Sequence, residues 1–395
     1  MSTQSLFPLG ASITLADLET NAHATLHRLR STEPVSWLSV LNTWLITRRD
    51  DAITVMRDAK TYTVDHPGFS TAQVVGPSML SFDGADHLHH RQPFEKPFRK
   101  RAVETRFHEP ISTMISDLID GLIQEGRAEL RRDFAGPVAV QTMVMALGLP
   151  QVAVSDVLAW YDTIVDAVTR VTAGEPVSQE GQRAFAALRK SLLPALRGSA
   201  DASLLAVASG QADGLSEDQI VSNAAVLLFG GIETTEGMIA NALYFLLTNP
   251  DVLNAVRADS SLIANVVEES LRMEPAAAAV DRYATVDVEL GKTMIKAGDL
   301  VRVSLSAANR DPDTFPNPDQ FDPTRPNLQS HVTWAQGPHV CLGLHLARLE
   351  THQALQQILL RCPNLQLKDD VKARELAHPR GLIFRKPQAL QVTWS

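Results

Sequence analysis

A long, almost uninterrupted apolar run constrains the fold of this chain more than any other feature. It begins at Ile220, directly after SEDQ (216–219), which has the Ser-x-x-Gln form of a helix capping box. It ends at Asn249-Pro250, because proline cannot continue a helix. Apolar residues occupy nearly every face, so the helix needs other elements around it. We therefore expect a helix over 216–249 that crosses the protein interior.

Other segments predict a mainly α fold with a small β region. Helical periodicity favours helices over 251–273 and 342–361, the second ended by Cys362-Pro363. Hairpin patterns occur at 36–48 and 286–298, and a further strand region over 381–394 closes the chain. The loosest stretches, 172–181 and 209–218, are too short to be domain linkers. We expect a single domain over 1–395.

Composition excludes several classes of function. The net charge of −9 argues against general nucleic-acid binding, which needs a basic surface. The N-terminus lacks the charged and apolar regions of a signal peptide, and no apolar run has the roughly 20 residues of a membrane span. With Cys341 and Cys362 as the only cysteines, a reducing cytoplasm is the expected location.

Cys341 lies in TWAQGPHVCLGLHLARLE (333–350), between Gly337 and Gly343. The glycines remove side chains near the sulfur, and the helix that starts near Leu342 directs free N–H groups at it, which favours a thiolate. An isolated cysteine is more often a small buried hydrophobe, and Cys362 is interpreted that way. A cysteine protease is poorly supported, because no oriented base is identifiable. Cys341 is therefore the candidate metal ligand.

The order of several motifs resembles the cytochrome P450 family, the haem-thiolate monooxygenases, over nearly the whole chain. The family's Phe-x-x-Gly-x-x-x-Cys-x-Gly loop matches Trp334, Gly337, Cys341 and Gly343, and Leu346-Ala347-Arg348 continue it. Upstream lie Glu269-x-x-Arg272 and the segment 304–327, which contains Ala-Asn-Arg-Asp. The resemblance implies a P450-like fold with a long helix over haem b (iron protoporphyrin IX), and Cys341 as its axial ligand.

Two positions depart from the family pattern. Trp334 replaces the usual phenylalanine, and Ala335 replaces the usual glycine. Alanine predicts a backbone without positive φ, and tryptophan adds bulk and an N–H beside the haem edge. Both changes are expected to leave haem binding intact and to affect the reduction potential.

The resemblance also assigns the groups that contact haem and oxygen. Propionate-binding positions fall on His87, Arg91, Arg282 and His339. His87 and Arg91 are one helical turn apart and share a face. The family's acid–alcohol pair falls on Glu233 and Thr234, after Gly230 and Gly231 in mid-helix, each of which costs about 1 kcal/mol against alanine. Thr234 would hydrogen-bond O₂ and Glu233 would relay protons. The alternative is a threonine bonded back to the preceding turn.

The sequence indicates that a separate protein supplies the electrons. No Gly-x-Gly-x-x-Gly turn is present, so electrons must come from a separate donor. KPFRKRAVETR (96–106) supplies a basic surface for an acidic ferredoxin through Lys96, Arg99, Lys100, Arg101 and Arg106. A solvated charge run is the equal alternative.

The substrate is expected to be a small apolar organic molecule. The resemblance places Val226, Phe229, Gly230, Ala278, Ala279, Val280 and Leu382 in its pocket. Segments 66–78 and 162–178 would form the entrance and lid, although Val165, Val168 and Val171 fit an ordinary core equally well.

Two other functions stay open. One is a peroxide-driven haem-thiolate enzyme, which the intact Glu233-Thr234 pair disfavours. The other is a non-catalytic haem-based ligand sensor, in which an oxygen-activating pair would serve no purpose.

Overall fold

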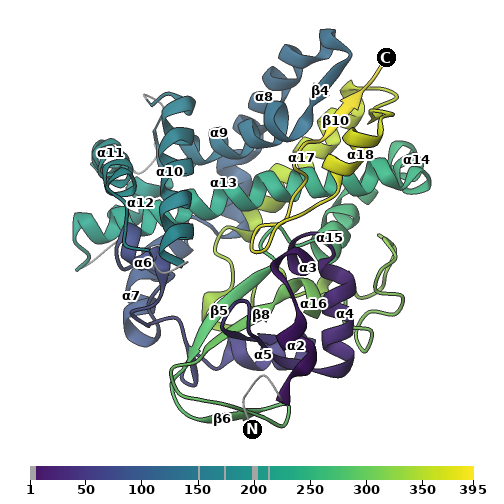
Figure 1. Ribbon diagram of the computed structural model, residues 1–395. Helices are drawn as coiled ribbons and strands as arrows, with labels where there is room; N and C mark the ends of the chain where they lie inside the picture. Colours follow the sequence, from purple (N-terminus) through teal and green to yellow (C-terminus); the bar gives the residue numbers. More distant parts are fainter. Residues whose placement is uncertain (1–5, 150–151, 173–174, 198–202, 212–213) are drawn as a thin grey trace.

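The computed structural model describes residues 6–149, 152–172, 175–197, 203–211 and 214–395, and helices dominate it (Figure 1). The longer helices are α4 (Ala22–Thr32), α5 (Arg49–Arg57), α7 (Gly84–Glu95), α8 (Lys100–Leu122), α9 (Gly136–Leu147), α10 (Val154–Thr172), α11 (Gln179–Leu196), α13 (Glu217–Thr248), α14 (Pro250–Ala258), α15 (Ile263–Met273) and α17 (Leu344–Arg361). The shorter ones are α2 (Pro8–Ser12), α3 (Leu15–Glu19), α6 (Ser70–Val75), α12 (Leu204–Ser209), α16 (Leu305–Ala308) and α18 (Val371–Ala377). The mainly α prediction is confirmed.

Within the described residues, the strands form three small sheets. Their bounds are β1 (Val35–Leu38), β2 (Thr43–Ile46), β3 (Tyr62–Thr63), β4 (Arg127–Glu129), β5 (Ala279–Ala284), β6 (Val288–Leu290), β7 (Thr293–Ile295), β8 (Leu300–Ser304), β9 (Gln366–Leu367) and β10 (Gln391–Thr393). The largest sheet has the order β1-β2-β8-β5-β3, with β2 and β8 parallel and the other neighbours antiparallel. Trp37 pairs with Trp44 across the predicted first hairpin. The hairpin predicted over 286–298 is β6 paired with β7.

Helix α13 crosses the centre of the molecule, as its sequence predicts (Figure 1). The Ser216 side chain accepts from the Gln219 N–H, and the Gln219 side chain accepts from the Ser216 N–H, which completes the capping box. Helices α9, α15 and α17 pack on it. Most of its side chains are buried, so hydrophobic burial holds it in the interior.

The prediction of one helix over 251–273 is wrong. The chain forms α14, then a 3₁₀ turn over Ser260–Leu262, then α15. Asp259 causes the break, because its carboxylate accepts from the Ser261 N–H at 3.0 Å and replaces a helical bond. The region 381–394 is also less regular than predicted. Only Gln391–Thr393 form a strand, β10, which pairs with β4 and β9.

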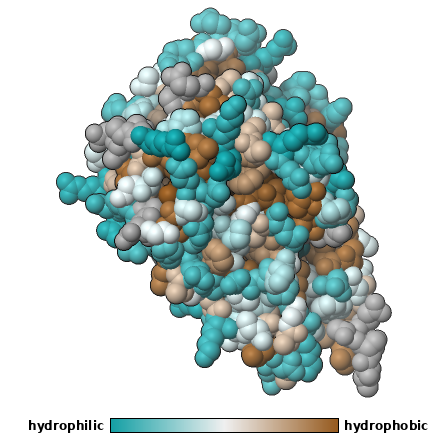
Figure 2. All heavy atoms as spheres, turned by 90° about the vertical axis from the view of Figure 1, so that its left-hand side faces the viewer, coloured by the Kyte–Doolittle hydropathy of each residue, from teal (hydrophilic) through white to brown (hydrophobic). Residues whose placement is uncertain are grey.

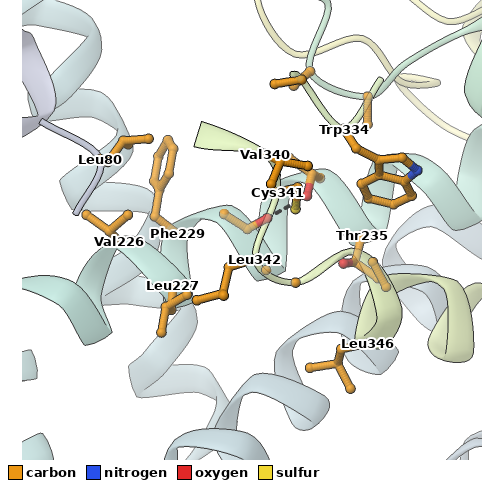
Figure 3. A pocket seen from close by; sticks show the side chains of 18 of the residues that line it. Leu80, Val226, Leu227, Phe229, Thr235, Trp334, Val340, Cys341, Leu342 and Leu346 are labelled. Carbon is orange, nitrogen blue, oxygen red and sulfur yellow. Dashed lines mark hydrogen bonds between the residues drawn. The ribbon is translucent and has the colours of Figure 1, made fainter. Parts of the chain in front are cut away.

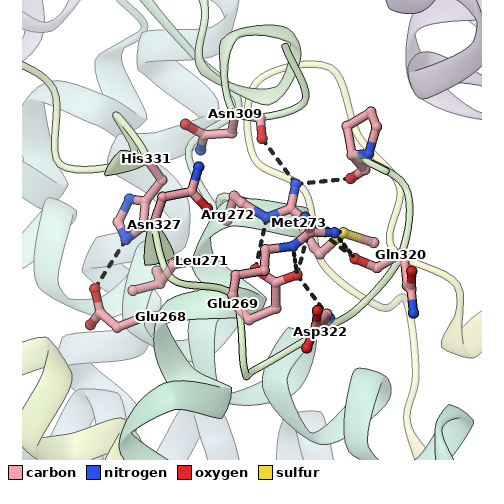
Figure 4. A network of polar contacts seen from close by, with 12 residues as sticks. Glu268, Glu269, Leu271, Arg272, Met273, Asn309, Gln320, Asp322, Asn327 and His331 are labelled. Carbon is pink, nitrogen blue, oxygen red and sulfur yellow. Dashed lines mark hydrogen bonds and ion pairs between the residues drawn. The ribbon is translucent and has the colours of Figure 1, made fainter. Parts of the chain in front are cut away.

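A buried polar network fixes α15 against the loop that precedes Cys341 (Figure 4). Glu269 and Arg272, both fully buried, form two hydrogen bonds of 2.7 and 2.8 Å. Arg272 also donates to the carbonyls of Asn309, Pro318 and Gln320. Arg325, which the sequence did not single out, donates to Glu269 Oε1 at 2.9 Å. One carboxylate and two guanidiniums therefore hold the loop, and backbone carbonyls accept the remaining guanidinium hydrogen bonds.

The two predicted entrance segments contain helices. Segment 66–78 contains α6, and segment 162–178 contains the end of α10, apart from 173–174, which lie outside the described residues. These two helices pack on each other. Val165, Val168 and Val171 belong to the core around α10, which agrees with the ordinary-core interpretation. No helix in the described part of the chain has the length and hydropathy of a membrane span.

Candidate active site

A largely apolar cavity of about 290 Å³ lies between α13 and the loop that leads into α17 (Figure 3). Cys341 lines this cavity, and its backbone N–H donates to the Trp334 carbonyl at 2.8 Å. Burial raises the pKa of the Cys341 thiol, whereas the backbone N–H groups of Gly343 and Leu344, together with Arg91 and Arg348, act in the opposite direction. The predicted helix start behind the sulfur is therefore present, with its amides directed at the thiol.

The two glycines near Cys341 act differently. Gly337 has φ +75°, and a Cβ there would lie 2.6 Å from the Met56 carbonyl of α5, so the loop can approach α5 only with glycine. Gly343 lines the cavity, and a Cβ there would meet nothing within 4 Å. The prediction for Ala335 is wrong, because this alanine has φ +59°. Burial of Ala335 in the core beside the largest sheet offsets the conformational cost of this left-handed backbone, about 1–2 kcal/mol.

Trp334 lies beside Cys341 with its indole nitrogen directed away from the sulfur (Figure 3). Nε1 is buried and without a hydrogen-bond partner, and the Arg348 guanidinium lies 4.8 Å from the ring centroid. Glu268 holds Arg348 through bonds of 2.6 and 2.9 Å and also contacts His331 at 3.1 Å. Burial raises the pKa of Glu268, but these two partners outweigh it and lower the pKa to about 2. A fixed positive charge therefore lies next to the cysteine loop.

The four predicted propionate ligands lie close together, although His87 and Arg282 are not among the residues that line the cavity. Arg91 and His339 line it, and the His87 and His339 rings lie 4.2 Å apart. Arg91 Nη2 donates to the Val340 carbonyl at 2.7 Å. Asp83 contacts His339 at 2.8 Å and acts electrostatically on buried Arg282. Burial lowers the pKa of Arg282 and of His339.

The His87 ring is held between two backbone carbonyls at this edge. Its Nδ1 lies 2.8 Å from the Met79 carbonyl and its Nε2 lies 3.1 Å from the Pro338 carbonyl. Contacts on both ring nitrogens fix the orientation of the ring. Arg91 and Arg282, with His87 and His339 beside them, form a cationic wall that fits a ligand with two carboxylates.

Thr234 lines the cavity, but its hydroxyl donates to the Gly230 carbonyl at 2.5 Å, the geometry of the alternative interpretation. The two glycines before it differ. A Cβ at Gly230 would meet nothing within 4 Å, whereas one at Gly231 would lie 2.3 Å from Met143 Sδ. Gly230 therefore leaves room in the cavity, and Gly231 permits close packing of α9.

Glu233 lies outside the cavity lining and is bound from two other elements. Tyr161 of α10 donates to one carboxylate oxygen, and Lys386 Nζ lies 2.8 Å from the other. Lys386 also contacts Glu236 at 2.5 Å, and Arg131 reaches Glu236 at 2.8 Å. Sequence reasoning missed Lys386 and Tyr161, because neither lies in a motif and both approach α13 only through tertiary packing.

The structure divides the predicted substrate residues into two groups. Val226, Phe229, Gly230 and Val280 line the large cavity. Ala278, Ala279 and Leu382 do not; they line a smaller pocket next to the N-terminal helices. Successive residues of a strand face opposite sides, so Val280 and Ala279 of β5 cannot both face the cavity. Lining residues that the sequence missed include Leu80, Met143, Leu227 and Leu305.

A haem would fit these residues. A thiol with two backbone donors faces the cavity, a cationic wall lies at one side, and the remaining lining is mostly apolar. Haem iron accepts a cysteine thiolate, and the cations match the propionates. Cys362 is fully buried away from this cavity, in the core around α17.

Comparisons with known proteins agree with the geometry. The family profile described as Cytochrome P450 matches residues 182–394. The chain is 31% identical to cytochrome P450 monooxygenase PikC of Streptomyces venezuelae, over 96% of this chain and 92% of that protein. It is 34% identical to vitamin D(3) 25-hydroxylase of Pseudonocardia autotrophica, over 92% of each chain. The crystal structure of CalO2 superposes with a TM-score of 0.86 at 28% identity, over 96% of this chain and 97% of that one. The chain therefore belongs to the cytochrome P450 family, whose members are haem b-dependent monooxygenases.

Proposed function

We propose that the cavity beneath α13 binds haem through Cys341 and that this enzyme oxidises a small apolar molecule there, as one domain acting in a reducing cytoplasm. The observation that carries the proposal is the convergence of Cys341, two backbone donors and a cationic wall on one apolar cavity. When bound, haem supplies the activation of O₂ and the oxidising power. The chain supplies binding, orientation and protons.

The cationic wall would hold the two haem propionates. His87 and Arg91 project from one face of α7, and His339 adds a third group from the cysteine loop. Arg282 of β5 completes the set. Asp83 connects the wall to the end of β3, since it contacts His339 and also accepts from the Val64 N–H at 2.8 Å. These positions orient the cofactor and keep water from its edge.

Thr234 and Glu233 would manage protons on the side of α13. Thr234 faces the cavity, and rotation of its side chain would exchange the bond to Gly230 for one to a polar atom in the cavity. Glu233 points toward α10 and Lys386, where it can take protons from the outside. The two residues are adjacent on α13, so a proton would pass from one to the other through water.

The part of the lining around Phe229 favours an apolar substrate. It is formed by Leu80, Val226, Leu227, Phe229 and Val280. Besides Cys341, the titratable side chains in the lining are Arg91, His339 and Glu350, and the first two belong to the cationic wall. A relative named as vitamin D(3) 25-hydroxylase supports the same substrate class.

The electron donor would be an acidic ferredoxin that docks on the segment 96–106. Lys96, Arg99, Lys100 and Arg101 are exposed, and Arg106 is half-buried over the Phe107 ring. Lys100 is close enough to His345 of α17 to help lower the pKa of that histidine, although burial is the larger cause. Because α17 begins directly after Cys341, this contact supports docking on the cysteine side.

The proposal is tested by three measurements on the haem-loaded protein. Cys341→Ser should abolish the red-shifted carbonyl spectrum of a thiolate-bound ferrous haem, whereas the matched control Cys362→Ser should retain it. NADH consumption with a ferredoxin and its reductase, compared with turnover by peroxide alone, separates a monooxygenase from a peroxide-driven enzyme. Spin-state shifts across a library of apolar compounds identify the substrate. An intact spectrum in Cys341→Ser would remove the assignment of the ligand.

A further inference from the structure

His90 of α7 is a buried histidine directly before Arg91 of the cationic wall. Figure 2 shows the side of the molecule that lies at the left of Figure 1, where α7, α11 and α12 are, and hydrophilic side chains cover much of its surface. His90 does not belong to that surface, because it is only 2% exposed. Its Nδ1 lies 3.1 Å from Nδ2 of Asn223, and its Nε2 lies 3.4 Å from Nε2 of Gln219. The ring therefore connects α7 to the first turns of α13.

Other bonds fix the orientation of these two amide groups. Asn223 is fully buried, and its Oδ1 accepts from the Met79 N–H at 2.7 Å. Gln219 Oε1 accepts from the Ser216 N–H at 2.8 Å, within the capping box of α13. Exchange of oxygen and nitrogen in either amide would break one of these bonds to the backbone. Each amide therefore presents its NH₂ group, which can only donate, to the His90 ring.

This arrangement requires a neutral His90 ring. Asn223 Nδ2 donates to His90 Nδ1 only when Nδ1 carries no hydrogen. Burial is the main cause that lowers the pKa of His90, and His89 and His87 act in the same direction, whereas Asp86 acts in the opposite one. A bond with Asn223 would raise this pKa only if the ring were the donor, which the orientation of the amide forbids.

The elements around His90 do not offer an anion that would hold a charged ring. In the described part of the chain, α12 packs on α7, and its segment LLAVAS contains no titratable side chain. Glu217 and Asp218 at the start of α13 pair with arginines of α11. Asp86, the acid that acts on the pKa of His90, is exposed one turn earlier on α7. A charged ring would therefore be buried without an acceptor and without a close counter-ion.

Asn223 also connects this contact to the cationic wall. Its Oδ1 holds the N–H of Met79, and the Met79 carbonyl lies 2.8 Å from His87 Nδ1. Met79 itself lines the cavity. Since α7 carries both His87 and Arg91, its position against α13 is also the position of this part of the wall. One buried amide of α13 therefore fixes two points next to the expected haem edge.

We propose that His90 and Asn223 are positioning residues of the haem-binding wall and that they act only while the His90 ring is neutral. The inference rests on the proposed function, because the wall needs this alignment only if it holds the haem propionates. Protonation of His90 would replace the bond from Asn223 by a contact between two donors. Helix α7 would then separate from α13, and haem release would become faster.

The size of the effect follows from the ordinary pKa of histidine. A ring that is released from the contact titrates near 6.5, whereas the held ring excludes the proton. The contact is therefore fully stabilising above pH 6.5 and weakens as the pH falls below that value. One pH unit below 6.5, separation of α7 from α13 becomes about tenfold more favourable.

The rate of haem release tests this role without turnover. It is measured by transfer of ferric haem from the loaded protein to an excess of apomyoglobin between pH 7.5 and pH 5.5. His90→Asn retains an acceptor near the position of Nδ1 and takes up no proton in this range. It should release haem at the wild-type rate at pH 7.5 and about tenfold more slowly than wild type at pH 5.5. Equal rates at pH 5.5 overturn the proposal.

Two further variants show which group is responsible. His89→Asn, at the exposed neighbouring position, is the control and should follow the wild-type pH profile. Asn223→Asp keeps an oxygen for the Met79 N–H and presents a second oxygen to His90 in place of the NH₂ group. A protonated His90 can donate to that oxygen, so acid should slow haem release in this variant. Acceleration in acid as steep as that of wild type would contradict the assignment to His90.

Nitrogen-15 NMR of the histidine-labelled ferrous carbonyl protein measures the protonation of the ring directly. The His90 signals are assigned by their absence from His90→Asn. At pH 6.5, where a free histidine is half protonated, they should be those of a neutral ring with hydrogen on Nε2. A ring that is half charged at this pH, or that carries its hydrogen on Nδ1, overturns the proposal. Failure of wild type to bind haem at pH 7.5 would instead refute the proposed function.

Discussion

Lys386 connects the last segment of the chain to α13, and its removal provides the sharpest test of how Glu233 is held. Its Nζ lies 2.8 Å from Glu233 and 2.5 Å from Glu236, and all three side chains are nearly buried. Lys386→Met keeps the length of the side chain and removes the charge. Two carboxylates one helical turn apart then face each other with only Tyr161 and Arg131 as partners.

The magnitude follows from the geometry. At 2.8 Å and an effective dielectric constant of about 20, Coulomb's law gives about 6 kcal/mol for one pair. Desolvation offsets a large part of this, and loss of one partner of a buried pair costs about 3–5 kcal/mol. We expect a loss of about 3 kcal/mol, because Arg131 still neutralises Glu236. With an unfolding entropy of about 0.8 kcal/mol per kelvin for 395 residues, the Tm should fall by about 4 °C.

The assay is thermal unfolding of the haem-loaded protein, combined with a double-mutant cycle. Lys386→Arg is the control and should keep most of the stability. Lys386→Met combined with Glu233→Gln should be less destabilised than the sum of the single variants by at least about 1 kcal/mol, since the unpaired charge disappears. Product per NADH should also fall in Lys386→Met, because Glu233 loses its position. A Tm change below about 1 °C with additive single effects would refute the reasoning.

Three further expectations address separate parts of the site. Thr234→Ala should bind substrate normally but release reducing equivalents as hydrogen peroxide, whereas Glu233→Gln should slow NADH consumption itself. Product, peroxide and NADH are measured together for both variants. A wild-type ratio of product to NADH in Thr234→Ala would exclude Thr234 from oxygen activation. Charge reversal at Arg99 and Lys100 should slow reduction by an acidic ferredoxin by one to three orders of magnitude at low salt, and less at high salt; an unchanged rate at low salt would place docking elsewhere. The pKa of Glu268 is lowered to about 2, against 4.5 in a model peptide, so ionised Glu268 adds to the free energy of unfolding, fully above pH 4.5 and less as the pH falls toward 2. Glu268→Gln should therefore be less stable than wild type at neutral pH and should lose less stability in acid. Parallel plots of unfolding free energy against pH for the two proteins would contradict this.

The sequence alone predicted the helices and hairpins whose patterns involve residues close together in the chain. The capping box at Ser216 and the all-round apolar run predicted α13, because both depend on residues within a few turns of each other. The position of Cys341 before a helix start was also predictable, since helix amides always point toward their N-terminus. The first two hairpins followed from alternation and turn residues. The break at Asp259 was not apparent, because periodicity continues across it.

Tertiary structure decided the partners of these groups. Ala335 takes a positive φ because the packing of the cysteine loop against the sheet compensates for its strain, which no local pattern reports. Lys386 reaches Glu233 from 153 positions further along the chain, so only the path of the last segment brings them together.

The same limit separates two glutamates that look alike in sequence. Glu268 of α15 and Glu350 of α17 are both buried, yet the pKa of Glu268 lies below its usual value and the pKa of Glu350 lies well above it. The difference is whether the fold places cations next to the carboxyl group, as it does with Arg348 and His331 for Glu268. Sequence determines which groups can titrate, and the packed neighbours determine which of them carry charge.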